Sequence, residues 1–243
     1  EILALAHKRI GLAAKIGIYK VKTNLPVRDF NREKECFSRA YQIAKKIGLK
    51  KPYADQVMHK LIEIAVHAQK YHREKNRVQG HKKALVIGGA GRMGLWLSNF
   101  LASLGYQVKI ADPKGPLKQF DHCTNYLNDP LDQDLIAVAT PLRESKEILK
   151  QIGKKNPTGL VFDVGSLKGP LISQLKFLCK KGIKAVSLHP MFGPKTELLT
   201  KKQIIVVDVG SKKAVQEVCQ LFSSTMANMV MMNADDHDEM IAY

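Results

Sequence analysis

Residues 83–94 read Lys-Ala-Leu-Val-Ile-Gly-Gly-Ala-Gly-Arg-Met-Gly, and this stretch decides the fold. Its short apolar run suits a buried strand, and a helix-like segment over 95–104 follows the glycines. A strand, a glycine-rich turn and a helix in this order form the unit that binds dinucleotide pyrophosphates. Gly89 would make the turn, Gly91 would let the backbone approach the pyrophosphate, and Gly94 would let the helix pack closely on the strand.

The start of that helix offers free backbone N–H groups and the positive end of the helix dipole, with Arg92 and Met93 in its first turn. These groups would hold the pyrophosphate. A second strand, 107–111, ends in Asp112, whose carboxylate would bind the adenosine ribose hydroxyls. Because an acid here repels a 2′-phosphate, the sequence predicts NAD rather than NADP as the cofactor. Lys114 weakens that preference without reversing it.

The composition is that of a soluble globular protein with one large or two modest domains, at 243 residues and 45% hydrophobic. We expect no membrane-spanning segment, no signal peptide and a cytoplasmic location. The four cysteines are scattered without a C-x-x-C pair, which argues against a metal site or a disulfide framework. Both ends lie in helix-like stretches, so we expect each to be cut through an element.

The net charge of +17 is uneven, because residues 1–83 carry 20 basic and 7 acidic residues. Such a surplus suggests an anionic partner, either nucleic acid or small substrates with several carboxylates. A lysine-rich solvated surface would account for much of the same charge.

The basic part predicts three helices, over 1–23, 31–47 and 52–71. Asp29 and Asn31 are both candidate caps for the second helix. An apolar stripe marks one face of the first helix: Ile2, Leu5, Leu12 and Ile16. Three helices of this size make a thin core, so we expect them to dimerise or to pack on a neighbour.

Polar residues in this part form a recognisable pattern. Arg9 and Lys20 lie 11 positions apart, close to three helical turns, and so project from one face. Asp29, Arg32 and Glu33 also share a face, at the start of the second helix. Together with Leu25-Pro26 and Gln69, this pattern resembles the all-helical class of chorismate mutase.

The resemblance implies a role for each of these residues. Arg9 and Arg32 would clamp substrate carboxylates, while Lys20 and Gln69 would donate to the ether oxygen whose C–O bond breaks. Glu33 and the backbone at Asp29 would hold the ring hydroxyl. Such a rearrangement needs only a reactive conformer and donors aimed at the developing charge. Ala65 replaces a serine frequent in this class, and the early part of the first helix, which supplies an arginine to the partner subunit, is absent.

Residues 72–83 are polar and without period, and predict a linker between a helical domain, 1–71, and a second domain, 84–243. The second domain alternates strands and helices, which indicates a Rossmann-type α/β fold with a mostly parallel sheet. Further strands are predicted over 135–139, 160–163, 184–188 and 204–207, and helices over 144–152, 170–180 and 211–224.

Ligands of such sheets bind where the strands end. Thr140-Pro141 ends one strand and would lie along the cofactor. The loop 163–169, with Ser166 and Lys168, ends the next, and His189 ends the one after. A lone histidine after a strand is more often structural than catalytic, but His189 would share its edge of the sheet with Ser166 and the nicotinamide.

The order of these motifs resembles prephenate dehydrogenase and, behind the mutase pattern, the bifunctional chorismate mutase/prephenate dehydrogenase family of tyrosine biosynthesis. The resemblance implies that chorismate is rearranged to prephenate, which is then oxidised and decarboxylated to 4-hydroxyphenylpyruvate. His189 would take the proton of the ring hydroxyl. Ser166 would orient His189 or touch the same hydroxyl, and Lys168 would shape the loop or attract carboxylates.

The family also implies a homodimer, through the mutase helices and through a further helical domain that this chain lacks. His237-Asp238 would lead into that domain, or His237 is a solvated residue at a helix start. Since the missing domain supplies an arginine for a prephenate carboxylate, we expect this chain to bind NAD but to turn over poorly.

Alternatives stay open at this point. Arogenate could replace prephenate as the substrate. A nucleic-acid binder with an NAD-sensing domain would use the basic helices, although their few aromatics and the acids Asp29 and Glu33 argue against nucleic acid as a partner. A pseudoenzyme that binds NAD is the third alternative, disfavoured by the intact polar residues.

Overall fold

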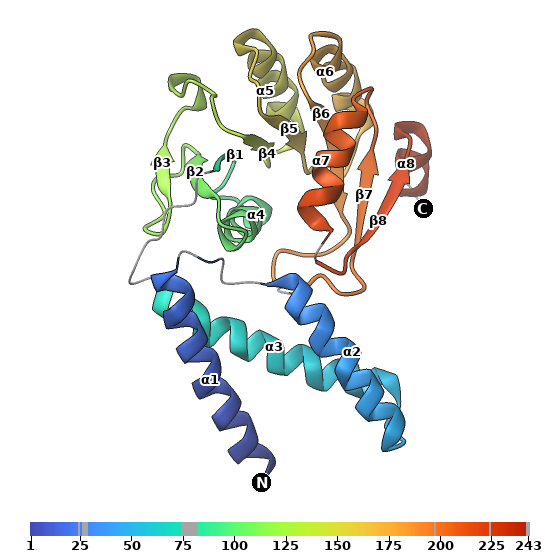
Figure 1. Cartoon of the computed structure of the whole chain (residues 1–243). Coiled ribbons are helices and arrows are strands. Elements are labelled where there is room, and N and C mark those ends of the chain that lie inside the picture. Colours follow the sequence, from blue (N-terminus) through green and yellow to red (C-terminus); the bar gives the residue numbers. More distant parts are fainter. Residues whose placement is uncertain (24, 26–28, 74–81, 197, 224, 242–243) are drawn as a thin grey trace.

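The computed structural model describes residues 1–23, 25, 29–73, 82–196, 198–223 and 225–241. Three helices lie at one end of an α/β unit (Figure 1), so the predicted fold class is confirmed. The helices are α1 (Ile2–Lys22), α2 (Phe30–Lys46) and α3 (Lys51–Arg73). Their bounds agree with the predicted ones to within two residues. Most of the predicted linker, at 74–81, lies outside the described residues.

Asp29 is the residue that caps α2, since its side chain accepts a hydrogen bond from the backbone N–H of Arg32 at 3.0 Å. The other candidate cap, Asn31, lies inside the helix. At the far end Gly48 takes φ of +71°, the left-handed conformation that commonly follows a helix.

One eight-stranded sheet organises the rest of the chain, in the order β3-β2-β1-β4-β5-β6-β7-β8. All neighbours are parallel except β6 and β7. The strands are β1 (Lys83–Ile87), β2 (Gln107–Ala111), β3 (Asp121–Cys123), β4 (Leu135–Val138), β5 (Leu160–Asp163), β6 (Ala185–Pro190), β7 (Gln203–Val207) and β8 (Asn228–Met232). The order reverses direction at β1, where ligands bind in sheets of this kind.

Successive side chains of each strand point to opposite faces of the sheet. Both faces bury apolar side chains, and helices cover both. Ala84 and Val86 belong to the core beneath α4 (Arg92–Ser103) and α7 (Lys212–Phe222). Leu85 and Ile87 belong to the core beneath α5 (Leu142–Lys155) and α6 (Gly169–Lys180). The described part of the chain also has a short 3-10 turn, η1 (Tyr126–Asn128), and a last helix, α8 (Ala234–Ile241).

The helical region packs on the α/β unit through α2 and α3. Phe30, at the start of α2, is 3% exposed and lies 6.2 Å from Phe100 of α4, measured between ring centroids. Asp55 of α3 forms an ion pair with Lys201, in the loop between β6 and β7. The expected packing on a neighbour is therefore present within this chain.

The apolar stripe of α1 is not buried by the described residues. Ile2, Leu5, Leu12 and Ile16 are 84%, 63%, 53% and 49% exposed. The positions of α1 that are buried are Ala13 and Gly17, since α3 lies against that side of the helix.

Candidate active sites

The glycine-rich turn joins β1 to α4 and leaves no room for side chains at two of its positions. A Cβ atom on Gly94 would lie 2.1 Å from the carbonyl oxygen of Gly88, so only glycine lets α4 approach this closely. A Cβ atom on Gly89 would lie 2.6 Å from the side chain of Ile110. At Gly91, just before α4, the nearest atom is the Gly88 oxygen at 3.2 Å, so this position is open enough for a ligand to approach the backbone.

Asp112 ties the end of β2 to this turn. Its carboxylate accepts hydrogen bonds from the backbone N–H groups of Ala90, at 3.0 Å, and Lys114, at 2.9 Å. It is 6% exposed. The acid therefore sits beside the glycine-rich turn, where the predicted ribose contact requires it, and each oxygen keeps a lone pair for a ligand.

The loop after β4 lies beside the same turn. A Cβ atom on Gly88 would lie 2.7 Å from the Thr140 side chain, so the two loops are in contact. Thr140 Oγ1 lies 2.9 Å from the hydroxyl of Ser145, which also donates to the Thr140 carbonyl at 3.0 Å. Pro141, the residue before α5, is exposed. The loop that carries both predicted cofactor contacts thus lies against the glycine-rich turn.

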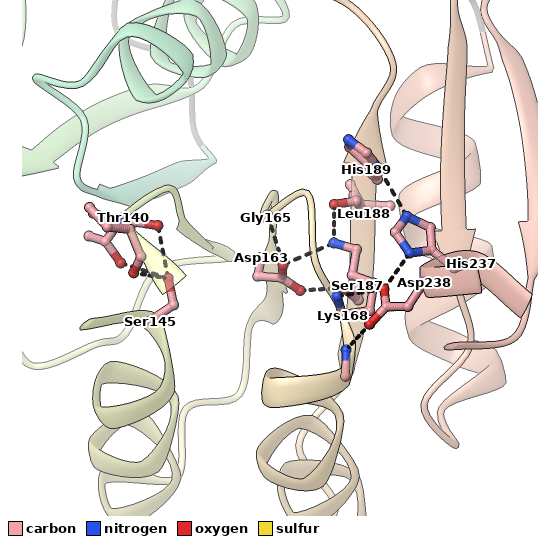
Figure 2. A network of polar contacts seen from close by, with 12 residues as sticks. Thr140, Ser145, Asp163, Gly165, Lys168, Ser187, Leu188, His189, His237 and Asp238 are labelled. Carbon is pink, nitrogen blue, oxygen red and sulfur yellow. Dashed lines mark hydrogen bonds and ion pairs between the residues drawn. The ribbon is translucent and has the colours of Figure 1, made fainter. Parts of the chain in front are cut away.

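His189, on β6, is half-buried and is held by α8. Its Nδ1 lies 2.9 Å from Nε2 of His237, whose own Nδ1 lies 2.8 Å from a carboxylate oxygen of Asp238 (Figure 2). His237 is fully buried, so its reading as a solvated residue was wrong. Burial first, then the electrostatic effect of Lys168 and of the neighbouring His237, lowers the pKa of His189 from 6.5 to about 4. The imidazole is therefore neutral at neutral pH and able to accept a proton.

Lys168 is fully buried beneath His189. Its ammonium donates to the Asp163 carboxylate at 3.0 Å and to the Leu188 carbonyl at 2.6 Å, while Ser187 donates to the other oxygen of Asp163. Lys168 was predicted to bind substrate, and the structure corrects this, since an ammonium without exposed surface cannot reach a substrate carboxylate. Its other expected role, shaping the loop, agrees with these contacts.

Ser166 is exposed in the loop between β5 and α6, at the same edge of the sheet as His189. Within the part of the chain that the structure describes, no hydrogen bond joins the two side chains. His237, not Ser166, contacts Nδ1 of His189.

The mutase pattern brings buried, unpaired polar atoms to α1 and α3. Nε of Arg9 and Oε1 of Gln69 are both buried without a hydrogen-bond partner among the described residues. Buried polar atoms of this kind indicate a missing ligand or water. Gly17 packs against Gln69, and Lys20 follows Gly17 by about 4.5 Å along the helix axis. Lys20 therefore lies less than one helical turn beyond the point where α1 contacts Gln69.

The α2 residues of the pattern are less clearly assembled. Glu33 is 8% exposed, as expected of a residue that faces a site. Arg32 is largely exposed and donates to Glu35 of its own helix at 2.6 Å, so the structure does not bring it to Arg9. The side chain of Asp29 serves as the helix cap, which leaves its predicted backbone contact untested.

Sequence reasoning missed the residues that lie behind His189 and hold it. Asp163 directly follows a buried strand, and this position was a usable signal for a functional acid. His237 and Asp238 sit in a polar stretch that looks solvated, and no local pattern predicted their burial. No group of residues suited to a metal ion occurs in the described ranges, and no helix there is long and apolar enough to cross a membrane.

Two family models match the chain. Residues 1–70 match chorismate mutase type II, and residues 111–231 match the nucleotide-binding domain of prephenate dehydrogenase. The second match begins after the glycine-rich turn, so the assignment of that turn rests on its sequence and geometry.

Curated relatives share the two-part organisation. The T-proteins of Enterobacter agglomerans and Haemophilus influenzae are each 22% identical to the chain and match 100% of it. The chain spans 62% of the length of either relative. A probable arogenate/prephenate dehydrogenase of Methanocaldococcus jannaschii is 22% identical over 64% of the chain and 37% of its own length.

Solved structures share the fold of the α/β unit. The prephenate dehydrogenase of Aquifex aeolicus, in complex with hydroxyphenyl propionate and NAD+, matches 68% of this chain and 64% of its own with a TM-score of 0.56 and 21% identity. Synechocystis arogenate dehydrogenase matches 66% and 63% with a TM-score of 0.53 and 16% identity. With both family models in this order, and with relatives similar along its whole length, the chain belongs to the bifunctional chorismate mutase/prephenate dehydrogenase family.

Proposed function

We propose that the protein catalyses two successive steps of tyrosine biosynthesis. The helical region rearranges chorismate to prephenate, and the α/β unit oxidises and decarboxylates prephenate to 4-hydroxyphenylpyruvate with NAD. The observation that carries the second step is His189, a neutral imidazole at the strand-end edge of the sheet that also bears the glycine-rich turn. Free cysteines and a biosynthetic role fit a cytoplasmic location.

The residues around the glycine-rich turn fit NAD. Gly91 leaves the backbone open to a pyrophosphate, the first turn of α4 supplies N–H groups at Arg92 and Met93, and Asp112 offers a carboxylate to the ribose. When bound, NAD supplies the hydride acceptor. Thr140 and Pro141 belong to the loop that contacts this turn and would lie along the cofactor.

In the dehydrogenase step, His189 accepts the proton of the prephenate ring hydroxyl as the carbon that bears it gives up a hydride. The ring carboxylate leaves as carbon dioxide, and its electron pair restores the aromatic ring. The phenol oxygen takes the proton back. One prephenate and one NAD thus give 4-hydroxyphenylpyruvate, carbon dioxide and NADH. Ser166, exposed on the neighbouring strand end, would contact the same hydroxyl.

In the mutase step, the protein binds and orients chorismate without a nucleophile or base. The buried, unpaired atoms of Arg9 and Gln69 mark where polar groups of the substrate would bind. Gln69 and Lys20 would donate to the ether oxygen as it gains negative charge. Glu33 and the backbone at Asp29 would hold the ring hydroxyl, and Arg32 would need to leave Glu35 to reach a carboxylate.

A homodimer through the mutase helices is part of this proposal. The stripe Ile2, Leu5, Leu12 and Ile16 presents apolar side chains to solvent along α1, and a second copy would cover it. Sedimentation of the wild type and of a Leu5→Glu, Leu12→Glu variant checks this. The variant should sediment as a smaller species.

Two matched variants of the full-length protein test the paired activities. His189→Asn should lower NADH formation from prephenate by about 10²-fold or more and leave the loss of chorismate absorbance unchanged. Gln69→Leu should lower chorismate loss by a similar factor and spare prephenate oxidation. Each variant then serves as the folding control of the other.

Substrate choice is read in the same assay. If the protein oxidises arogenate in place of prephenate, arogenate is the substrate of the second step. The proposed oxidative decarboxylation with NAD then still holds. A wild-type protein that binds NAD but converts neither chorismate, prephenate nor arogenate would refute the enzymatic proposal.

A further inference from the structure

A continuous chain of hydrogen bonds runs from His189 into α8 and back to the loop after β5. The Asp238 carboxylate accepts hydrogen bonds from the backbone N–H groups of Lys168, at 2.9 Å, and Gly169, at 2.6 Å, one at each oxygen. One of these oxygens also contacts Nδ1 of His237, and Nε2 of His237 contacts Nδ1 of His189. Figure 2 shows these contacts in line, with the second nitrogen of His189 on the side of the ring away from His237.

The partners decide which nitrogens carry protons. Burial alone would raise the pKa of Asp238, but the two backbone donors and His237 hold it below its usual value, so the carboxylate is charged and only accepts. Nδ1 of His237 must therefore carry the proton that it donates to Asp238. In a neutral imidazole Nε2 then accepts, which requires Nδ1 of His189 to donate. The second nitrogen of His189, Nε2, is left with a free lone pair.

We propose that His237 and Asp238 are positioning residues that fix His189 as the Nδ1–H tautomer, so that its Nε2 is the atom that accepts the proton of the substrate hydroxyl. The inference rests on the dehydrogenase function proposed above, and adds two residues that act through His189. The other charged groups near His189 are Lys168 and Asp163, which bind each other. Among the described residues, neither of them forms a hydrogen bond with the imidazole of His189, so the tautomer is set from α8.

Geometry distinguishes this role from simple packing. His237 is fully buried, yet both of its nitrogens have polar partners, and Asp238 is fixed by two backbone donors rather than by a mobile side chain. These contacts satisfy both nitrogens of a buried imidazole, and one of them is made to Nδ1 of His189 itself. In catalytic histidines elsewhere, loss of the residue that sets the tautomer lowers kcat strongly while binding persists.

Two substitutions at one position separate the roles. The amide of His237→Gln can donate to Asp238 and accept from His189, whereas His237→Leu fills space but makes neither hydrogen bond. Asp235→Asn, on the exposed side of α8, is the matched control. The ¹⁵N shifts of the His189 ring, assigned with His189→Asn, should report the Nδ1–H form in the wild type, the control and His237→Gln. His237→Leu should move them toward the Nε2–H form that free histidine prefers in water.

Kinetics of the full-length protein complete the test. His237→Leu should lower kcat for prephenate oxidation by about 10²-fold with little change in the KM values for prephenate and NAD, and His237→Gln should recover most of the loss. If His237→Leu leaves both the ¹⁵N shifts and kcat unchanged, the inference is overturned. If the shifts change as expected but the wild type oxidises no prephenate, the tautomer assignment stands and the proposed function falls.

Discussion

The ammonium of Lys168 lies 3.0 Å from the carboxylate of Asp163, and neither side chain has more than 1% of its surface exposed. Burial lowers the pKa of Lys168, and the Asp163 charge opposes that shift. The pair fastens the loop after β5 to β6, because Lys168 also donates to the carbonyl of Leu188, next to His189. The loop and the strand that carries His189 therefore form one unit.

Removing one partner should cost much more than replacing both. Lys168→Met leaves the Asp163 carboxylate buried beside Ser187 without its cation, and should lower the free energy of unfolding by about 3–5 kcal/mol. The double variant with Asp163→Asn removes both charges and should recover at least half of that loss. Urea unfolding measures both. Equal stability of the single and double variants would show that the unpaired charge of Asp163 does not cause the loss of stability.

The glycine-rich turn predicts different defects at two glycines. Gly94→Ala places a methyl group 2.1 Å from the Gly88 oxygen and should destabilise the protein by about 1–3 kcal/mol. Gly91→Ala meets that oxygen at 3.2 Å and should fold, but its methyl group occupies the approach of the pyrophosphate and should weaken NAD binding about tenfold. Thermal unfolding without NAD, followed by an NAD titration, separates the two. Unchanged NAD affinity in Gly91→Ala would show that the pyrophosphate does not bind against Gly91.

The pH dependence of prephenate oxidation should follow His189. Its pKa is lowered to about 4, by burial first and then by Lys168 and His237, and only the neutral form accepts a proton. The acid limb of kcat/KM should therefore lie well below pH 6.5, with activity lost as the pH falls toward 4 and unaffected by this group above 6.5. A pH profile of kcat/KM measures it. An acid limb at or above pH 6.5 would show that the pKa of His189 is not lowered in the free enzyme.

Asp112 should decide the choice between NAD and NADP. Asp112→Asn keeps the shape of the side chain and one acceptor for the N–H groups of Ala90 and Lys114, but removes the charge that repels a 2′-phosphate. The ratio of kcat/KM with NAD to that with NADP should fall by about tenfold, in line with the loss of a charged hydrogen bond. The same ratio in Lys114→Ala is the control, since that change should favour NAD further.

The sequence predicted best where burial is continuous along an element. The runs that became β1, β4 and β5 are apolar at nearly every position, and the glycines at 89, 91 and 94 have a geometric reason to be glycine. Edge elements left no such signal. β3 has three residues and a polar side chain at its start, and the side chains of β8 are exposed or half-buried, so neither strand alternates clearly.

The candidate site was predicted only as far as the local pattern reaches. His189 and Asp112 follow buried strands, and strand ends meet at one edge of a parallel sheet. His237 contacts His189 from 48 positions further along the chain, and its burial depends on where α8 packs. Lys168 was expected to shape the loop or attract substrate carboxylates, and its pairing with Asp163 was not predicted because the two side chains meet only after the loop has folded back.

The contact between α1 and α3 predicts opposite effects of one substitution at two glycines of the same helix. A Cβ atom on Gly17 would lie 2.8 Å from Cα of Gln69, so Gly17→Ala must push α3 away. Chorismate mutase activity should then fall about tenfold or more, because Gln69 is displaced from the position in which it would contact the substrate. A Cβ atom on Gly11 would meet nothing within 4 Å, so Gly11→Ala should raise helix stability by about 0.5–1 kcal/mol and keep activity. Rates of chorismate loss and thermal unfolding of the two variants give the answer, with prephenate oxidation unchanged in both. Full mutase activity in Gly17→Ala would mean that the close approach of α1 to Gln69 does not shape the site.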